Sequence, residues 1–130
     1  MKFLLACLAL PVITTPALAD VTREPLATYR VAPGKTVGRV EVKKITITPG
    51  GRTALHTHPG PVVSYVLQGT VIVQVKGEPA KTYKPGDTIF EPGNTGVEKF
   101  DNGSATEPAV FVATYLLGAD DTEIIHFVGE

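Results

Sequence analysis

The chain has 130 residues, a length that suits one domain. Its 12 Lys and Arg against 13 Asp and Glu leave a formal net charge of −1, which argues against nucleic acid as a partner because nucleic-acid binding favours basic patches. The single cysteine, Cys7, lies close to the N-terminus, so the rest of the chain has no disulfide and no cysteine nucleophile and must rely on an ordinary hydrophobic core.

Residues 1–19 are predicted to be a secretory signal peptide. They begin with Lys2, continue with an apolar run of about ten residues and end in Ala17-Leu18-Ala19, an A-x-A cleavage signal. The run is too short to span a bilayer, which takes about 20 apolar residues. We therefore expect cleavage after Ala19, a periplasmic or secreted protein, and no membrane contact after cleavage. A retained anchor is the alternative.

Residues 20–33 are mixed and polar and are expected to form an N-terminal arm, with one edge strand at Leu26–Val31. The next stretch, "VGRVEVKKITITPG", alternates apolar and polar residues, which is typical of a strand with one buried face. The alternation shifts phase at Lys43-Lys44, which predicts a β-bulge there.

The middle of the chain is a series of short strands. "VVSYVL" and "TVIVQV" are dense in β-branched residues and are separated by Gln68-Gly69. Turns at Gly77, Pro85-Gly86, Pro92-Gly93 and Asn102-Gly103 separate the strands that follow. Eight to ten strands without a helical period predict an all-β sandwich or small barrel over residues 34–118, followed by a C-terminal tail or strand at 119–130.

Several of these strands are apolar on both faces. In "VVSYVL", Val62 and Val66 share one face, while Val63, Tyr65 and Leu67 share the other. Only one face of such a strand is buried in a small barrel, and large exposed apolar patches are rare on monomers. We therefore expect a homodimer formed by contact between sheets.

Two histidines, His56 and His58, stand one residue apart in "TALHTHPG". Side chains in a strand alternate between faces, so residues at this spacing point to the same side. Imidazoles are common metal ligands, but catalytic zinc usually takes three protein ligands and structural zinc takes four. The pair is therefore half of a candidate metal site.

The glycines and prolines around this pair resemble the two motifs of the cupin superfamily. Gly50, five residues, His56-Thr57-His58 and later Gly69 match the first motif, and Gly86, five residues and Pro92 match the start of the second. Over about residues 34–118 the chain resembles the small, exported, single-domain cupin-2 proteins. The resemblance implies a double-stranded β-helix, or jelly-roll barrel, with a metal held at its centre by two histidines and a glutamate of motif 1 and a histidine of motif 2.

The chain departs from this pattern at two positions. Val62, or Val63 with looser spacing, stands where the motif has glutamate, and the motif-2 histidine position falls on Val97 or Glu98, depending on the direction of counting. If Glu98 faces inward, His56, His58 and Glu98 form a set for iron, manganese or zinc. If Val97 faces inward, Val62 and Val97 give an apolar pocket with two imidazoles.

Two function classes follow, and the sequence leaves the choice between them open. One is an exported protein that binds a small organic ligand in the barrel cavity, with a divalent metal (iron, manganese, zinc, copper or nickel) or with none. The other is a metal-dependent oxygenase or isomerase that uses His56, His58 and Glu98. Glu91 is interpreted as a turn cap, Tyr115 as a sheet-packing residue and His126 as a structural histidine.

Overall fold

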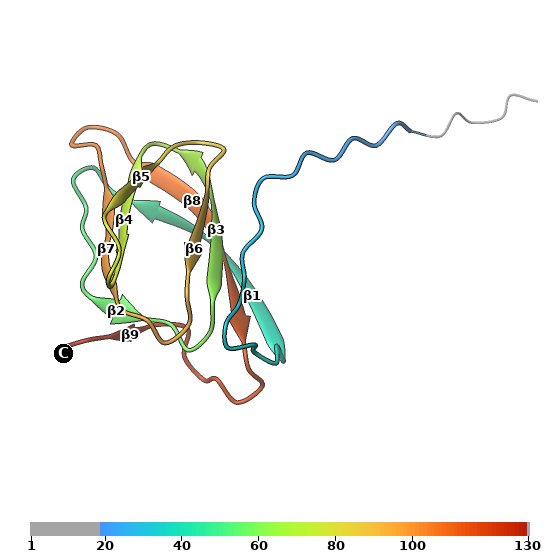
Figure 1. Ribbon diagram of the computed structural model, residues 1–130. Coiled ribbons are helices and arrows are strands. Elements are labelled where there is room, and N and C mark those ends of the chain that lie inside the picture. Colours follow the sequence, from blue (N-terminus) through green and yellow to red (C-terminus); the bar gives the residue numbers. More distant parts are fainter. Residues whose placement is uncertain (1–18, 130) are drawn as a thin grey trace, which may run out of the picture.

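The computed structural model describes residues 19–129, and within this range it consists of strands and loops without a helix (Figure 1). No described segment is therefore a helix that could cross a membrane. The proposed signal peptide falls on residues 1–18 and Ala19, of which only Ala19 lies within the described residues.

Two antiparallel sheets face each other (Figure 1). The four-stranded sheet has the order β1-β8-β3-β6, which comprise Arg39–Ile47, Ala109–Leu117, Val62–Gln68 and Thr88–Glu91. The five-stranded sheet has the order β5-β4-β7-β2-β9, which comprise Lys81–Tyr83, Val71–Val75, Val97–Asn102, His56–Thr57 and His126–Phe127. The prediction of an all-β jelly roll is confirmed.

The core lies between the two sheets. Each strand contributes the residues of its inner face, and β8 shows the pattern most regularly, with buried and partly exposed residues alternating along all nine positions. The buried apolar residues are Ile47, Val62, Val66, Val71, Val73, Val75, Ile89, Val97, Phe100, Ala109, Phe111, Ala113, Tyr115 and Leu117. Burial of these side chains is the main stabilising contribution, because residues 19–129 contain no cysteine.

β1 runs without a bulge, contrary to the prediction at Lys43-Lys44. It pairs with β8 in one unbroken register from Arg39 to Ile47. Ile45 and Ile47 face the core, whereas Val40 and Val42 lie on the outer face and are exposed. The apolar residues lie on different faces in the two halves of β1 because the first half lies beyond the core. There the inner positions hold the charged side chains of Glu41 and Lys43, which pair at 3.1 Å.

The register shifts occur elsewhere. One lies between Val66 and Gln68, where β3 pairs with β8, and it leads into Gly69. Gly69 has φ of +77°, and a Cβ at this position would lie 2.4 Å from the Pro108 carbonyl oxygen. Only glycine fits this turn, because a side chain would be both strained and in collision with the backbone.

Residues 20–38 form no strand, so the edge strand expected at Leu26–Val31 is absent. This segment instead contacts β6 through Tyr29, whose ring stacks on Phe90 with centroids 4.8 Å apart and whose hydroxyl lies 2.6 Å from Thr88 Oγ1. The chain N-terminal to this contact extends away from the barrel (Figure 1).

Candidate metal centre

His56 and His58 enter the barrel from the same short segment. His56 belongs to β2, where its neighbours are Val97 of β7 and Phe127 of β9. His58 follows two residues later, so that both rings lie inside while Thr57 between them is less buried. Each histidine is only 3% exposed.

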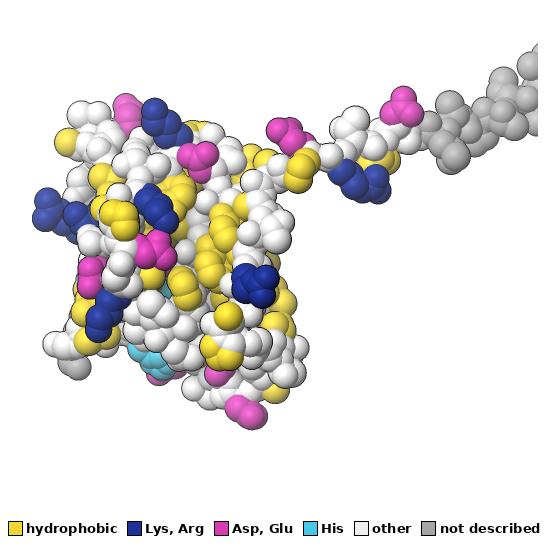
Figure 2. All heavy atoms as spheres, viewed as in Figure 1, with side chains coloured by type: hydrophobic (Ala, Val, Ile, Leu, Met, Phe, Trp, Pro, Cys, Tyr) yellow, Lys and Arg dark blue, Asp and Glu magenta, His cyan; other side chains and the backbone are white. Residues whose placement is uncertain are grey.

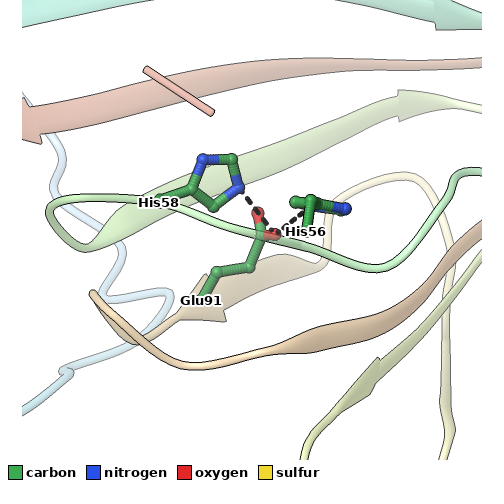
Figure 3. Close-up of side chains that lie close together, drawn as sticks. All are labelled: His56, His58 and Glu91. Atoms are coloured by element: carbon green, nitrogen blue, oxygen red, sulfur yellow. Dashed lines mark ion pairs between the residues drawn. The ribbon is translucent and has the colours of Figure 1, made fainter. Parts of the chain in front are cut away.

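Glu91 supplies a third donor from the opposite sheet. It is the last residue of β6 and is 3% exposed, and its side chain reaches between the two imidazoles (Figure 3). Its direct cross-strand partner in β3 is Val62, the position at which the cupin motif has its glutamate. Directly opposite residues of an antiparallel pair point to the same face. The carboxylate that the motif would place at position 62 is therefore supplied to the barrel interior by Glu91 of the neighbouring strand.

The three side chains present their donor atoms to one another. Glu91 Oε2 lies 3.3 Å from His58 Nε2 and 3.7 Å from His56 Nε2, and the candidate ligand atoms of the three residues lie within 4.8 Å of one another. His56 Nδ1 donates to the Ala54 carbonyl at 2.8 Å, and His58 Nδ1 donates to the Ile124 carbonyl at 2.6 Å. Because each Nδ1 carries the proton of the neutral ring, each Nε2 lone pair is free to bind a cation.

This arrangement fits a divalent metal ion. Apart from the two imidazole Nε2 atoms, the buried Glu91 Oε2 has no hydrogen-bond partner among the described residues, and a charged oxygen in this position is costly unless a protonated imidazole or a metal ion balances it. With bonds of about 2.0–2.1 Å, the donors of a tetrahedral site lie about 3.4 Å apart, close to the 3.3 Å and 3.7 Å that separate Glu91 Oε2 from the two Nε2 atoms. Two histidines and a carboxylate are a donor set that leaves positions open on zinc or non-haem iron.

The ion-pair geometry shifts two pKa values. Burial alone lowers the pKa of His56, but the facing Glu91 carboxylate and the Ala54 carbonyl outweigh burial and raise it above the ordinary value of 6.5. Burial alone raises the pKa of Glu91, but the two imidazoles outweigh burial and lower it below the ordinary value of 4.5. Without a metal, Glu91 is therefore the anionic partner of the histidine pair.

A chamber of about 130 Å³ lies beside the three donors. Its other lining residues are mostly apolar: Ile45, Ile47, Thr53, Phe100, Phe111, Ala113, Tyr115 and Ile125. Tyr115 lies edge-on to His58, with ring centroids 5.5 Å apart. Burial, with a smaller contribution from the charge of Glu91, raises the pKa of Tyr115 to about 12, so its phenol stays protonated at neutral pH.

The C-terminal segment completes this site. Ile124 provides the carbonyl that orients His58, Ile125 lines the chamber, and Phe127 lies edge-on to His56 at 6.0 Å. His126, in contrast, is exposed on the outside and pairs with Glu123 at 2.8 Å.

The structure does not bring Glu98 to the histidine pair. β7 begins at Val97, which is fully buried next to His56, so the following residue, Glu98, points outward and is exposed. Val97 and Val62 belong to the buried core, but neither lines the chamber, contrary to their assignment as pocket residues.

Glu91 was not identified as a donor because the motif positions were counted along continuous stretches of sequence. Glu91 instead reaches the histidines through the pairing of neighbouring strands. The available signal was the alternation in "TIFEPG": Ile89 is apolar and buried, so Glu91, two residues later, shares its inner face. A charged residue on a core face needs a partner, and this property separates Glu91 from a turn cap.

A family model described as "Cupin domain" matches residues 43–115. Among solved structures, a cupin-like protein from Thermotoga maritima is 26% identical with a TM-score of 0.58, and the match covers 70% of this chain and 65% of that one. A DMSP lyase from Ruegeria pomeroyi (17%, TM-score 0.59) and an oxalate oxidase in complex with the substrate analogue glycolate (22%, TM-score 0.57) each match over 68% of this chain, and over 43% and 46% of their own. The chain thus spans less than two thirds of each of these structures. No curated protein matches it.

Proposed function

The chain belongs to the cupin family, and we propose on this basis that it binds a divalent metal ion through His56, His58 and Glu91 and holds a small organic ligand beside that ion. The observation that carries the proposal is the buried Glu91 oxygen, which faces two Nε2 atoms and has no other hydrogen-bond partner among the described residues. Such an oxygen is expected where a cation binds.

The surrounding residues support a site for binding and orientation. The Ala54 and Ile124 carbonyls hold the imidazoles with Nε2 toward Glu91, and Phe100 and Phe111 make the wall beside them apolar. A bound divalent ion supplies Lewis acidity or, for iron, chemistry with dioxygen. Tyr115 offers a protonated phenol that can donate to a ligand oxygen.

A catalytic role is the second candidate function. A three-residue donor set leaves coordination positions for substrate or water, which is the pattern of catalytic rather than structural metal sites. The solved structures with the same fold include a lyase and an oxidase, which act on small molecules. On this reading the chain is a metal-dependent lyase, oxygenase or isomerase, with His56, His58 and Glu91 as ligands.

Metal analysis of the purified protein tests the proposal. We expect about one transition-metal ion per chain after expression in metal-replete medium, and binding weakened by more than about a hundredfold in His56→Ala and in Glu91→Gln. Elemental analysis gives the stoichiometry, and titration of the metal-free protein gives the affinity.

Glu98→Gln is the matched control, because it makes the same change on the exposed side of β7. It should bind metal like the unmodified chain. Absence of metal, or equal losses in Glu91→Gln and Glu98→Gln, would contradict the assignment of Glu91.

Export and self-association also form part of the proposed function. The leader at residues 1–19 supports secretion or a periplasmic location, and the mature protein is expected to begin at Asp20, as measured by intact mass. The outer face of the four-stranded sheet, formed by Val40, Val42, Tyr65 and Leu67, supports a homodimer because all four side chains are exposed.

A further inference from the structure

Lys35 and Asp121 form an ion pair that also contacts the loop after His58. Lys35 Nζ lies 2.9 Å from Asp121 Oδ2 and donates to the Pro59 carbonyl at 3.1 Å. Pro59 follows His58 directly in the chain. A Cβ at Gly60 would lie 2.9 Å from Lys35 Cε, so the stem of the lysine side chain lies against the same loop. The N-terminal arm therefore touches the segment that carries His58.

Asp121 in turn fixes the start of the C-terminal segment. Its Oδ2 accepts the Gly118 N–H at 2.7 Å, and its backbone carbonyl accepts Arg39 Nη2 at 2.8 Å. The Lys35 ammonium and, after it, the Gly118 N–H lower the pKa of Asp121 below the ordinary value of 3.8. The carboxylate is therefore charged at neutral pH, and the turn that begins at Gly118 is held at several points.

The same ammonium holds both sides of the hydrogen bond that orients His58. That bond joins His58 Nδ1 to the Ile124 carbonyl at 2.6 Å. On one side Lys35 binds the carbonyl of Pro59, the residue next to His58. On the other side it binds Asp121, which lies three residues before Ile124. Both ends of the hydrogen bond are thus tied to one group, which limits how far they can move apart.

Isolated ion pairs on protein surfaces contribute little, but this pair is part of a network. The side chains of Lys35 and Asp121 are 23% and 24% exposed, whereas those of Lys81 and Glu78, which pair at 2.7 Å at the start of β5, are 54% and 50% exposed. Lys35 and Asp121 each make a further hydrogen bond to the backbone. A network of this kind restrains the backbone segments that it joins.

On the proposed metal site, we infer that Lys35 and Asp121 are positioning residues, which keep the Ile124 carbonyl on His58 Nδ1 and so hold His58 Nε2 toward the metal position. Neither side chain belongs to the candidate donor group. Groups that orient a ligating histidine contribute about 10- to 100-fold to metal affinity. Because Lys35 acts through the Ile124 carbonyl, the effect of removing its ammonium should lie at the lower end of this range.

Calorimetric titration of the metal-free chain with cobalt(II) tests the role in metal binding. Lys35→Met removes the ammonium and keeps the length of the side chain, and it should weaken cobalt(II) binding roughly tenfold. In an Asp121→Ala background the same substitution should weaken binding by about twofold or less, because the network is already broken. Lys81→Met is the matched control, since it breaks another lysine–carboxylate pair at β5, and it should bind cobalt(II) like the unmodified chain.

A second measurement reports the orientation of the ring without metal. In the ¹⁵N-labelled, metal-free chain, exchange of the His58 Nδ1 proton with water measures how often its hydrogen bond to Ile124 opens. Lys35→Met should speed this exchange roughly fivefold. The His56 Nδ1 proton should exchange at its original rate, because its acceptor, the Ala54 carbonyl, lies only two residues away. A general loss of stability would instead speed exchange at both rings.

The outcomes separate this inference from the metal proposal. Cobalt(II) affinity that is unchanged in a Lys35→Met variant with the circular dichroism of the unmodified chain overturns the positioning role and leaves the metal site standing. Exchange that is unchanged at His58, or faster at both histidines, overturns the positioning role as well. A chain that binds no cobalt(II) but shows the selective change at His58 overturns the metal proposal and supports the positioning of the ring. Equal losses of affinity in Lys35→Met and Lys81→Met also overturn the inference.

Discussion

Glu91 and His56 make the stability of the metal-free protein depend on pH. The pKa of Glu91 is lowered by folding, so its stabilising contribution is present above its ordinary value of 4.5 and is lost as the pH falls through the lowered value. The pKa of His56 is raised, so its contribution is complete below 6.5 and is lost as the pH rises through the raised value.

The metal-free chain is therefore expected to gain most stability from this pair between about pH 4.5 and pH 6.5. Urea unfolding in the presence of a chelator, measured from pH 3 to pH 9, should show this maximum in the difference between the unmodified chain and Glu91→Gln. A difference that is constant across the range would show that the pair does not titrate as the geometry implies.

Single residues also show what sequence reasoning could reach. The histidine pair was found because its two members are two residues apart in the sequence, a spacing that places both side chains on one face of an extended segment. Glu91 and the Ile124 carbonyl were not found because they lie 33 and 66 residues from His58 and reach it only through the fold. The choice between Val97 and Glu98 depended on a one-residue register that counting cannot fix and that the pairing of β7 with His56 determines.

At the scale of elements, β9 is a very short strand whose surrounding segment makes several contacts at the candidate metal site. It has two residues, yet the segment around it orients His58, lines the chamber and packs on His56. Outer-shell partners of metal-binding histidines typically contribute 10–100-fold to metal affinity. The C-terminal segment is therefore expected to contribute to metal binding without supplying a donor side chain.

Removing residues 122–130 should weaken metal binding by roughly tenfold or more while leaving the β-sheet circular dichroism intact. The core strands β1 to β8 do not include this segment, so the barrel should fold. Deletion of residues 129–130 alone is the control and should have no effect. Equal metal affinity in both truncations would show that the Ile124 carbonyl does not orient His58 in the bound state.

At the scale of the whole molecule, the two faces of the four-stranded sheet differ in role. The inner face builds the core and the chamber, while the outer face keeps large apolar side chains exposed, with Val42 at 63% and Val40 at 53%. Figure 2 shows hydrophobic side chains gathered over the part of the surface where β3, β6 and the N-terminal segment lie. These exposed apolar side chains are the reason we propose an interaction site on this face.

The mature chain should therefore elute as a dimer in size-exclusion chromatography with light-scattering detection. Val42→Lys should shift it toward the monomer, because burying an unpaired ammonium in a sheet-to-sheet contact is unfavourable. Val21→Lys is the control, since Val21 is equally exposed at 66% but lies in the N-terminal arm. A monomeric unmodified chain, or a monomer caused equally by Val21→Lys, would exclude this face as the interface.

The whole fold was the part most accessible from the sequence. Turn glycines and prolines such as Gly69 and Pro92-Gly93, together with alternating strands, act locally and remain readable without coordinates. The prediction of a bulge at Lys43-Lys44 was wrong because β1 pairs in one unbroken register. The shift in the apolar pattern marks the point at which β1 leaves the core, which is a property of the assembled barrel. Local sequence patterns were thus sufficient to predict the architecture, whereas the composition of the site depends on strand pairing between distant residues.

The regular alternation along β8 has a practical consequence for engineering. Its odd-numbered residues from Phe111 to Tyr115 form part of the chamber wall, and its even-numbered residues from Val110 to Leu116 face away from it. A library that randomises only the odd positions would retune selectivity without altering the exterior. A library restricted to the even positions would change the outer face of the sheet without touching the interior, so one nine-residue strand offers two surfaces that can be varied independently.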